Sequence, residues 1–265
     1  MLSEEPAVTA TPQADDVPAI AESIGVVKFR GDPDRLQPLL LPPPVDPVGD
    51  GDAAFAILGD AIRPRRRQKD RTVPIEDTEF REAAVGMPCT FEDDHYVINP
   101  LQFLDRETES FRRGLTRGIA TVTKSKWHTP CKGRREITQG DSVTGSASHG
   151  GDGLFSLSMH LEERSDPTDL QDWVFEFMHY RHVSDPLAAA NATALANDIT
   201  VMDLPALEIG SIWRGPASVE FGCWRDGLLG DLAAEVVDGF HITMGYEYGG
   251  ERVVADVDDW GDHLE

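Results

Sequence analysis

Lysine is scarce in this chain, and most of its lysines gather in one segment. Only five of the 24 basic residues are lysines, and three of them, Lys124, Lys126 and Lys132, lie close together. A lysine amine can attack a carbonyl carbon when burial or a second cation lowers its pKa toward neutrality. The apolar and aromatic residues between these lysines suit that requirement. Residues 118–135 are therefore the first candidate for chemistry in the sequence.

The spacing of these lysines predicts which of them share a surface. On a strand, Lys124 and Lys126 lie two residues apart and point to one face, while Ser125 and Trp127 point to the other. Positions 110–135 hold eight basic residues and no acidic one. The alternative is therefore a solvated basic loop that binds an acidic surface of this molecule or of a partner. The residue types alone leave both interpretations open.

A second candidate nucleophile lies in the same segment. Cys131 follows His128 by three residues, and a thiol beside an imidazole can be activated, although one such pair is common by chance. The pair His179 and His182 could suggest a metal site, but residues three apart on a strand face opposite sides of it. The Gly-x-Ser-x-Gly turn of a serine hydrolase is absent from the sequence. A metal centre is not predicted.

Glu82 is the carboxylate whose position is most informative. It directly precedes the apolar run at residues 83–91 and so enters a candidate core strand. A carboxylate buried there needs a hydrogen-bonding partner or a proton. The alternative is an ordinary solvated side chain.

The composition excludes several classes of function. With 47 acidic and 24 basic residues the formal net charge is −23, which disfavours sequence-independent binding to nucleic acid and to anionic membrane surfaces. No apolar run is long enough to span a bilayer, and the acidic N-terminus lacks the pattern of a signal peptide. The three cysteines form no Cys-x-x-Cys pair, which favours a reducing cytoplasm. Glycine-rich phosphate motifs are also absent from the sequence, so no cofactor is predicted.

Short alternating segments separated by turn residues must position these side chains. Residues 92–94 and the glycines near position 150 mark two of the turns. Many short strands at regular spacing predict a mainly β, antiparallel protein that is closed as a barrel or stacked as a sandwich. Strands are expected at residues 24–29, 53–58, 87–91, 95–104, 142–148, 154–161, 172–181, 219–224 and 241–248.

Helical signal is limited to two segments. Residues 32–41 begin with the N-cap candidate Asp32 followed by Pro33, and residues 227–237 are the second candidate. Residues 1–20, rich in Ala, Pro, Thr and acidic side chains, predict a disordered or loosely attached arm. Residues 21–265 are expected to form a single domain.

Several short motifs resemble those of the acetoacetate decarboxylase family, in the order in which that family has them. Each motif is short, so the family is indicated by their order and spacing, over most of the chain. The motifs are residues 29–36 followed by 41–44, residues 80–82 followed by 87–91, residues 96–105 and residues 212–221.

The resemblance implies a closed, cone-like antiparallel β-barrel with peripheral strands, a few short helices and a reaction inside the cone. Enzymes of this family form a Schiff base between a lysine and a ketone and use the iminium as an electron sink. Lys132 matches the second lysine of the family's catalytic pair. Cys131 stands where the reactive lysine is expected, and Ser125 replaces a glutamate.

The resemblance also implies roles for the remaining candidates. Glu82 matches a glutamate that lines the family's active site, and Glu22 or Ser23 falls near the place of an arginine that would hold a substrate carboxylate. We expect Lys132, then Lys126, as the catalytic amine, with Glu82 as a proton shuttle or substrate orienter. The side chains expected to bind the substrate are those of Lys124, Trp127, His128, Cys131 and Trp213.

The expected function is that of a lyase without a cofactor, acting on a small oxo acid or related carbonyl compound. Its reaction would be a decarboxylation, an aldol or dehydration step, or a cyclisation in a secondary pathway. The alternative is a non-catalytic barrel that binds a small molecule and has lost the reactive lysine. We expect a cytoplasmic homo-oligomer with a small-molecule ligand and with neither nucleic-acid nor membrane partners.

Overall fold

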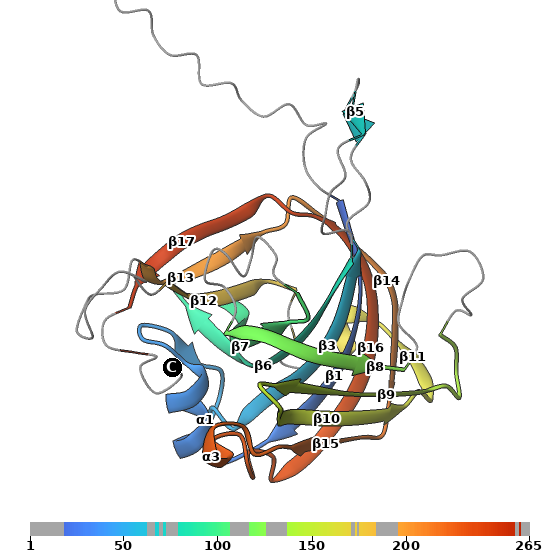
Figure 1. The fold of residues 1–265 in the computed structure, drawn as a ribbon, viewed down its shortest axis with the longest axis horizontal. Coiled ribbons are helices and arrows are strands. Elements are labelled where there is room, and N and C mark those ends of the chain that lie inside the picture. The colour runs from blue at the N-terminus through green and yellow to red at the C-terminus, as the bar shows by residue number, and fades with distance from the viewer. Residues whose placement is uncertain are drawn as a thin grey trace, which may run out of the picture.

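A large curled β-sheet dominates the structure (Figure 1). The computed structural model describes residues 19–62, 67–68, 71–72, 79–106, 117–125, 137–170, 173, 175–183, 196–257 and 260. The prediction of a mainly β protein is confirmed. The strands of the sheet are β1 (Ala19–Arg30), β2 (Asp46–Pro47), β3 (Ala53–Ile62), β6 (Glu79–Phe91), β7 (Asp94–Leu104), β8 (Gly118–Lys124), β9 (Ser142–His149), β10 (Asp152–His160), β11 (Glu163–Ser165), β12 (Phe177–Val183), β13 (Ala196–Asp203), β14 (Ala206–Gly215), β15 (Ala217–Phe221), β16 (Glu235–Glu247) and β17 (Gly250–Asp256).

The long strands β16, β1, β3 and β6 lie side by side in the sheet. Its main path runs β11, β14, β16, β1, β3, β6, β7, β8, β9, β10, β15, so β1 lies between β16 and β3. Both of these pairings are antiparallel. A separate two-stranded ribbon is formed by β4 (Arg67–Gln68) and β5 (Arg71–Thr72). Each of the nine expected strands overlaps an observed one, and the turn at residues 92–94 joins β6 to β7.

The sheet departs from the predicted barrel in two respects. It is mixed, because β7 pairs in parallel with both β8 and β12, so the prediction of a purely antiparallel sheet is wrong. The path also ends at β11 and β15, which do not pair with each other among the described strands. Figure 1 shows β8, β9, β10 and β15 crossing in front of β1, β3 and β16, so the sheet curls back over itself.

The central strands have an apolar core on each face. Side chains alternate along a strand, so neighbouring residues serve opposite faces. On β1, Val27 and Phe29 belong to the first core, which lies toward β8, β9 and β10. Ile24 and Val26 belong to the second core, which also contains Trp173. This double burial explains why β1 has few exposed positions.

The first of the two predicted helices is confirmed and the second is wrong. Helix α1 spans Pro33–Leu40, and the Asp32 side chain accepts the first-turn N–H of Asp34, as an N-cap does. At residues 227–237 the structure has only the end of the short helix α3 (Trp224–Gly227) and then turns into β16. Gly227 and Asp231 have positive φ angles, which end helical geometry, and Val236 pairs with Phe29 of β1.

Strand β1 begins at Ala19, so the last two residues of the predicted arm belong to the sheet, and residues 1–18 lie outside the described residues. None of the described helices has the length and apolar character needed to cross a membrane.

Candidate active site

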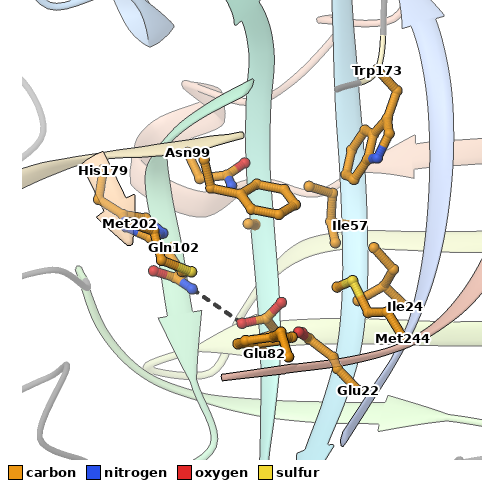
Figure 2. Close-up of a pocket in the computed structure, with 13 residues that line it drawn as sticks. Glu22, Ile24, Ile57, Glu82, Asn99, Gln102, Trp173, His179, Met202 and Met244 are labelled. Atoms are coloured by element: carbon orange, nitrogen blue, oxygen red, sulfur yellow. Dashed lines mark hydrogen bonds between the residues drawn. The ribbon is translucent and has the colours of Figure 1, made fainter. Parts of the chain in front are cut away.

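A small pocket lies on the second core face (Figure 2). The space inside it is about 50 Å³, which is room for a few water molecules and therefore for a ligand of a few non-hydrogen atoms. Strands β1, β3, β6, β7, β12, β13 and β16 contribute to its walls. The lining residues are Glu22, Ile24, Ile57, Glu82, Ala84, Asn99, Gln102, Trp173, Phe177, His179, Met202, Met244 and Tyr246.

Strand alternation and register bring two carboxyl groups into this apolar wall. Glu22 follows the side-chain direction of Ile24 on β1, and Glu82 follows that of Ala84 on β6. Strand β3 lies between them, with Gly59 opposite Glu82. The absence of a side chain at Gly59 leaves room there, since a Cβ would lie 2.9 Å from the Glu82 Oε1 atom. The two carboxyl groups meet above this glycine.

Glu22 and Glu82 form a hydrogen-bonded carboxyl pair. The pKa of Glu22 is raised well above its ordinary value by burial, then by the charge of Glu82 and by the hydrogen bond between the two side chains. Glu22 therefore holds the proton of the pair. Tyr246 donates its hydroxyl to Glu22 Oε2 at 2.9 Å, and Gln102 Nε2 donates to Glu82 Oε2 at 3.1 Å. This network can release or accept a proton inside the pocket.

His179 is a second ionisable group of the pocket wall. Its Nδ1 atom lies 3.4 Å from Oε1 of Glu251, and both side chains are almost fully buried. Burial by itself lowers the pKa of His179, but the charge and hydrogen bond of Glu251 outweigh it, so the pKa is raised. Tyr248 also donates its hydroxyl to Glu251 at 3.3 Å. The expectation that His179 and His182 face opposite sides of a strand is confirmed, because His182 packs beside Tyr180.

Lys124 is buried on the other face of the same strands. Its amine donates to the Ser23 carbonyl oxygen at 2.9 Å and to the Ser23 hydroxyl at 3.2 Å, and it lies 3.4 Å from Asp60 Oδ1. Burial lowers the pKa of Lys124, and Asp60, Glu22 and Glu82 partly offset this effect. Lys124 is thus a desolvated amine, and it does not line the pocket.

The structure brings only part of the predicted site together. Glu82 lines the pocket and Lys124 lies behind it, whereas Trp213 lies on β14, 5.8 Å beneath the Arg164 guanidinium and outside the pocket. No group of ligands suited to a metal ion occurs among the described residues. The predicted residues Lys126, Trp127, His128, Cys131 and Lys132 lie outside the described residues.

Sequence reasoning missed three ionisable residues of the pocket. Glu22 entered only as a position near an expected arginine, His179 only as a poor metal ligand, and Tyr246 not at all. A usable signal exists for the first two. Glu22 alternates with Ile20 and Ile24, and His179 alternates with Phe177, so each polar residue replaces an apolar one on a buried face.

Comparisons with known proteins agree with this architecture. A family model described as acetoacetate decarboxylase (ADC) matches residues 6–257. No curated protein matches the chain by sequence.

Solved structures of similar fold include three enzymes. An acetoacetate decarboxylase-like enzyme from Sphingomonas wittichii RW1 is 22% identical, with a TM-score of 0.74 and coverage of 94% of this chain and 98% of that one. The enduracididine biosynthesis enzyme MppR, complexed with the condensation product of pyruvate and imidazole 4-carboxaldehyde, is 20% identical, with a TM-score of 0.74 and 94% coverage of both chains. Acetoacetate decarboxylase from Legionella pneumophila subsp. pneumophila str. Philadelphia 1 is 15% identical, with a TM-score of 0.67 and coverage of 90% and 88%. At these identities the likeness concerns the fold.

Proposed function

The chain belongs to the acetoacetate decarboxylase family, and from this premise we propose that it is an enzyme acting on a small oxo acid or related carbonyl compound. One observation carries the proposal: Glu82 lines a small, largely apolar pocket and shares a hydrogen bond with a second carboxyl group. A carboxyl pair that holds one proton in an apolar wall is suited to general acid–base catalysis. MppR, which has a similar fold, is described with pyruvate bound.

The proposed reaction uses a lysine amine and the carboxyl pair in succession. Lys132, with Lys126 as second choice, attacks the substrate carbonyl, and loss of water gives an iminium. The iminium accepts the electron pair of a breaking bond, which releases carbon dioxide in a decarboxylation or a proton in an aldol or dehydration reaction. In a decarboxylation, Glu22 then donates its proton to the enamine carbon. In an aldol or dehydration reaction, Glu82 accepts the proton lost from carbon, and Glu22 donates one to the carbonyl oxygen of the second substrate or to the leaving hydroxyl. Water then hydrolyses the iminium and frees the lysine.

Borohydride trapping tests the amine. The protein is treated with sodium borohydride in the presence of pyruvate or acetoacetate, and the labelled peptide is mapped by mass spectrometry. We expect the label on one lysine between positions 124 and 132, and loss of label and of turnover in Lys132→Ala or Lys126→Ala. The Schiff-base mechanism is wrong if none of these lysines is labelled and Lys132→Ala keeps full activity.

A non-catalytic binding protein is the second candidate, and Lys124 favours it. This lysine of the candidate segment has its amine bonded to Ser23 and lies close to Asp60, away from the pocket. A rise in melting temperature with pyruvate, without turnover of either pyruvate or acetoacetate, would support a binding function over an enzymatic one.

A further inference from the structure

The described pocket wall contains a single side chain that can carry a positive charge. That side chain is His179, because neither lysine nor arginine occurs among the described lining residues. Its exposed fraction is 4%, so a charge on the ring is shielded from water and acts at short range. Figure 2 shows the ring on the same side of the pocket as Met202 and Gln102.

Glu251 fixes which nitrogen of His179 is available to a ligand. The Nδ1 atom faces the Glu251 carboxylate, at 3.4 Å from Oε1 and 3.5 Å from Oε2. The Nε2 atom is the ring nitrogen that does not face this carboxylate. A carboxylate at one ring nitrogen orients the ring and stabilises its protonated form, so that the other N–H can be donated to a second acceptor.

The charges around His179 also favour the protonated ring. Glu251 raises the pKa of His179 against the effect of burial, and Glu82 raises it further. The pKa of Glu251 is in turn lowered, since the charge and hydrogen bond of His179 outweigh burial. When His179 is protonated, the two side chains form an ion pair, and the remaining donor of the ring is the Nε2–H group.

The carboxyl pair does not compete for this donor. Glu82 Oε2 accepts from Gln102, which lies between His179 and Glu82 in the view of Figure 2, and the Glu22 proton is shared with Glu82. The pocket thus presents an imidazolium N–H in one part and an acidic proton in another. A small molecule with an anionic group beside a neutral carbonyl satisfies both.

We propose that His179, oriented by Glu251, binds the carboxylate of the substrate, which makes the substrate a 2-oxo acid or a similarly compact oxo acid rather than a neutral ketone. The proposal rests on the proposed function for the identity of the pocket as the substrate site. It names a specificity-determining residue and limits the substrate class by charge.

Binding of two probes of nearly equal shape tests this assignment. Pyruvate carries a carboxylate, and pyruvamide carries a neutral amide in its place. Calorimetric titration of the full chain is expected to give a dissociation constant for pyruvate that is lower by roughly tenfold or more, the effect of one charge-assisted hydrogen bond. His179→Gln, which keeps an N–H donor without the charge, is expected to abolish this preference while pyruvamide binding changes by less than about twofold.

His182→Gln is the matched control, because His182 lies on the same strand but faces Tyr180 on the other side. It is expected to keep the preference for pyruvate. If His179→Gln does not fold with a buried Glu251, the double variant His179→Gln/Glu251→Gln removes both charges and takes its place.

Three results would overturn the inference. They are a pyruvate preference that survives removal of His179, an equal loss of pyruvate and pyruvamide binding, and a wild-type protein that does not distinguish the probes or binds neither. Both probes carry the same ketone, so reaction with a lysine affects both, and the preference between them reports on His179. If borohydride traps no lysine but the preference for pyruvate depends on His179, the proposed catalysis is wrong and this inference stands. If a lysine is trapped but the preference for pyruvate does not depend on His179, this inference is wrong and the proposed catalysis stands.

Discussion

Glu22 and Glu82 face each other in an apolar wall, and this arrangement limits the charge that the pair can hold. Two carboxyl groups in hydrogen-bonding contact cannot both ionise without strong repulsion, so one proton stays between them. Burial is the larger cause at Glu22, and together with the charge of Glu82 it raises the pKa of Glu22 well above the ordinary value of 4.5. Glu22 therefore keeps its proton to a higher pH than an ordinary carboxyl group does, and this proton can be transferred to a bound molecule.

The raised pKa of Glu22 predicts a specific dependence of stability on pH. The folded protein binds this proton more tightly than the unfolded chain does, so its contribution to stability is complete below about pH 4.5 and is lost as the pH rises toward the folded-state pKa. Glu22→Gln cannot titrate and keeps a donor for Glu82. We expect the variant to gain stability relative to wild type as the pH rises, by at most about 1.4 kcal/mol per unit. Urea unfolding at a series of pH values checks this, and a pH-independent difference would contradict it.

Lys124 offers a prediction about burial of charge. Its side chain is fully buried and lies 3.4 Å from Asp60. Lys124→Met leaves the Asp60 carboxylate buried without this ammonium, which we expect to lower the free energy of unfolding by roughly 3–5 kcal/mol.

Two further variants identify the cause of that loss. Thr121→Ser, at an exposed position of the same strand, is expected to change the free energy of unfolding by less than about 0.5 kcal/mol. The double variant Lys124→Met/Asp60→Leu should recover part of the loss, because the isolated charge is gone. If it is no more stable than Lys124→Met alone, the ion pair is not what stabilises this site.

At the level of single residues, the sequence indicated which side chains could react better than it indicated which partners they contact. Glu82 was found because a carboxylate that enters a core strand needs a hydrogen-bonding partner or a proton. The side-chain direction of Lys124 followed from strand alternation, but its partners did not, since Ser23 and Asp60 lie far away in the chain. Glu22 and Ser23 are adjacent in sequence yet serve opposite faces of the sheet, and only the tertiary fold assigns each to its partner.

At the level of elements, local sequence patterns predicted the strands and the first helix correctly. They failed at residues 227–237, where apolar residues have a helical spacing but glycines and valines disfavour a helix. Residues 227–237 place leucines at intervals that suit a helix. Leu229 and Leu232 are indeed buried, but in an irregular turn, and Val236 pairs with Phe29 of β1. Tertiary pairing overrides helix propensity there. Local sequence patterns also could not predict that β7 pairs in parallel with β8 and β12, because such pairings depend on how the chain connects these strands.

Gly145 supports a prediction about the place where β9 packs against β3 and pairs with β8. A Cβ at this glycine would lie 2.4 Å from the Thr123 carbonyl oxygen and 2.7 Å from Leu58 Cδ1. Gly145→Ala forces these elements apart, and we expect it to lower the free energy of unfolding by roughly 1–3 kcal/mol. Chemical denaturation measures the change.

Gly153 is the matched control on the neighbouring strand β10. A Cβ there would have its nearest contact at 3.7 Å, with Gly222 Cα, so Gly153→Ala is expected to change stability by less than about 1 kcal/mol. Equal effects of the two substitutions would show that close packing at Gly145 is not the cause.

At the level of the whole molecule, one sheet separates two sets of ionisable groups. Lys124 and Asp60 lie on one face, and the pocket with Glu22 and Glu82 lies on the other. The lysine amine nevertheless interacts electrostatically with both glutamates through the sheet. A net charge of −23 makes such buried cations valuable to the fold, because they offset the self-repulsion of the acidic chain.

Trp260 joins the C-terminal end of the described chain to its beginning. Its Nε1 atom donates to the Pro38 carbonyl oxygen at 3.2 Å, its carbonyl oxygen accepts from the Tyr180 hydroxyl at 2.6 Å, and the two rings meet edge to face at 4.5 Å. The side chain is almost completely buried. Helix α1, strand β12 and the chain end are therefore held by one residue.

Trp260→Ala is expected to lower the free energy of unfolding by roughly 3–5 kcal/mol, the range for truncating a buried aromatic side chain. Trp260→Phe keeps an aromatic ring against Tyr180 and loses the donor to Pro38, so its loss should be nearer 1–2 kcal/mol. Urea unfolding monitored by circular dichroism gives both values. If both variants unfold like wild type, the chain end contributes nothing to the fold. If both lose the same large amount, the hydrogen bond to α1, rather than aromatic packing, is what Trp260 supplies.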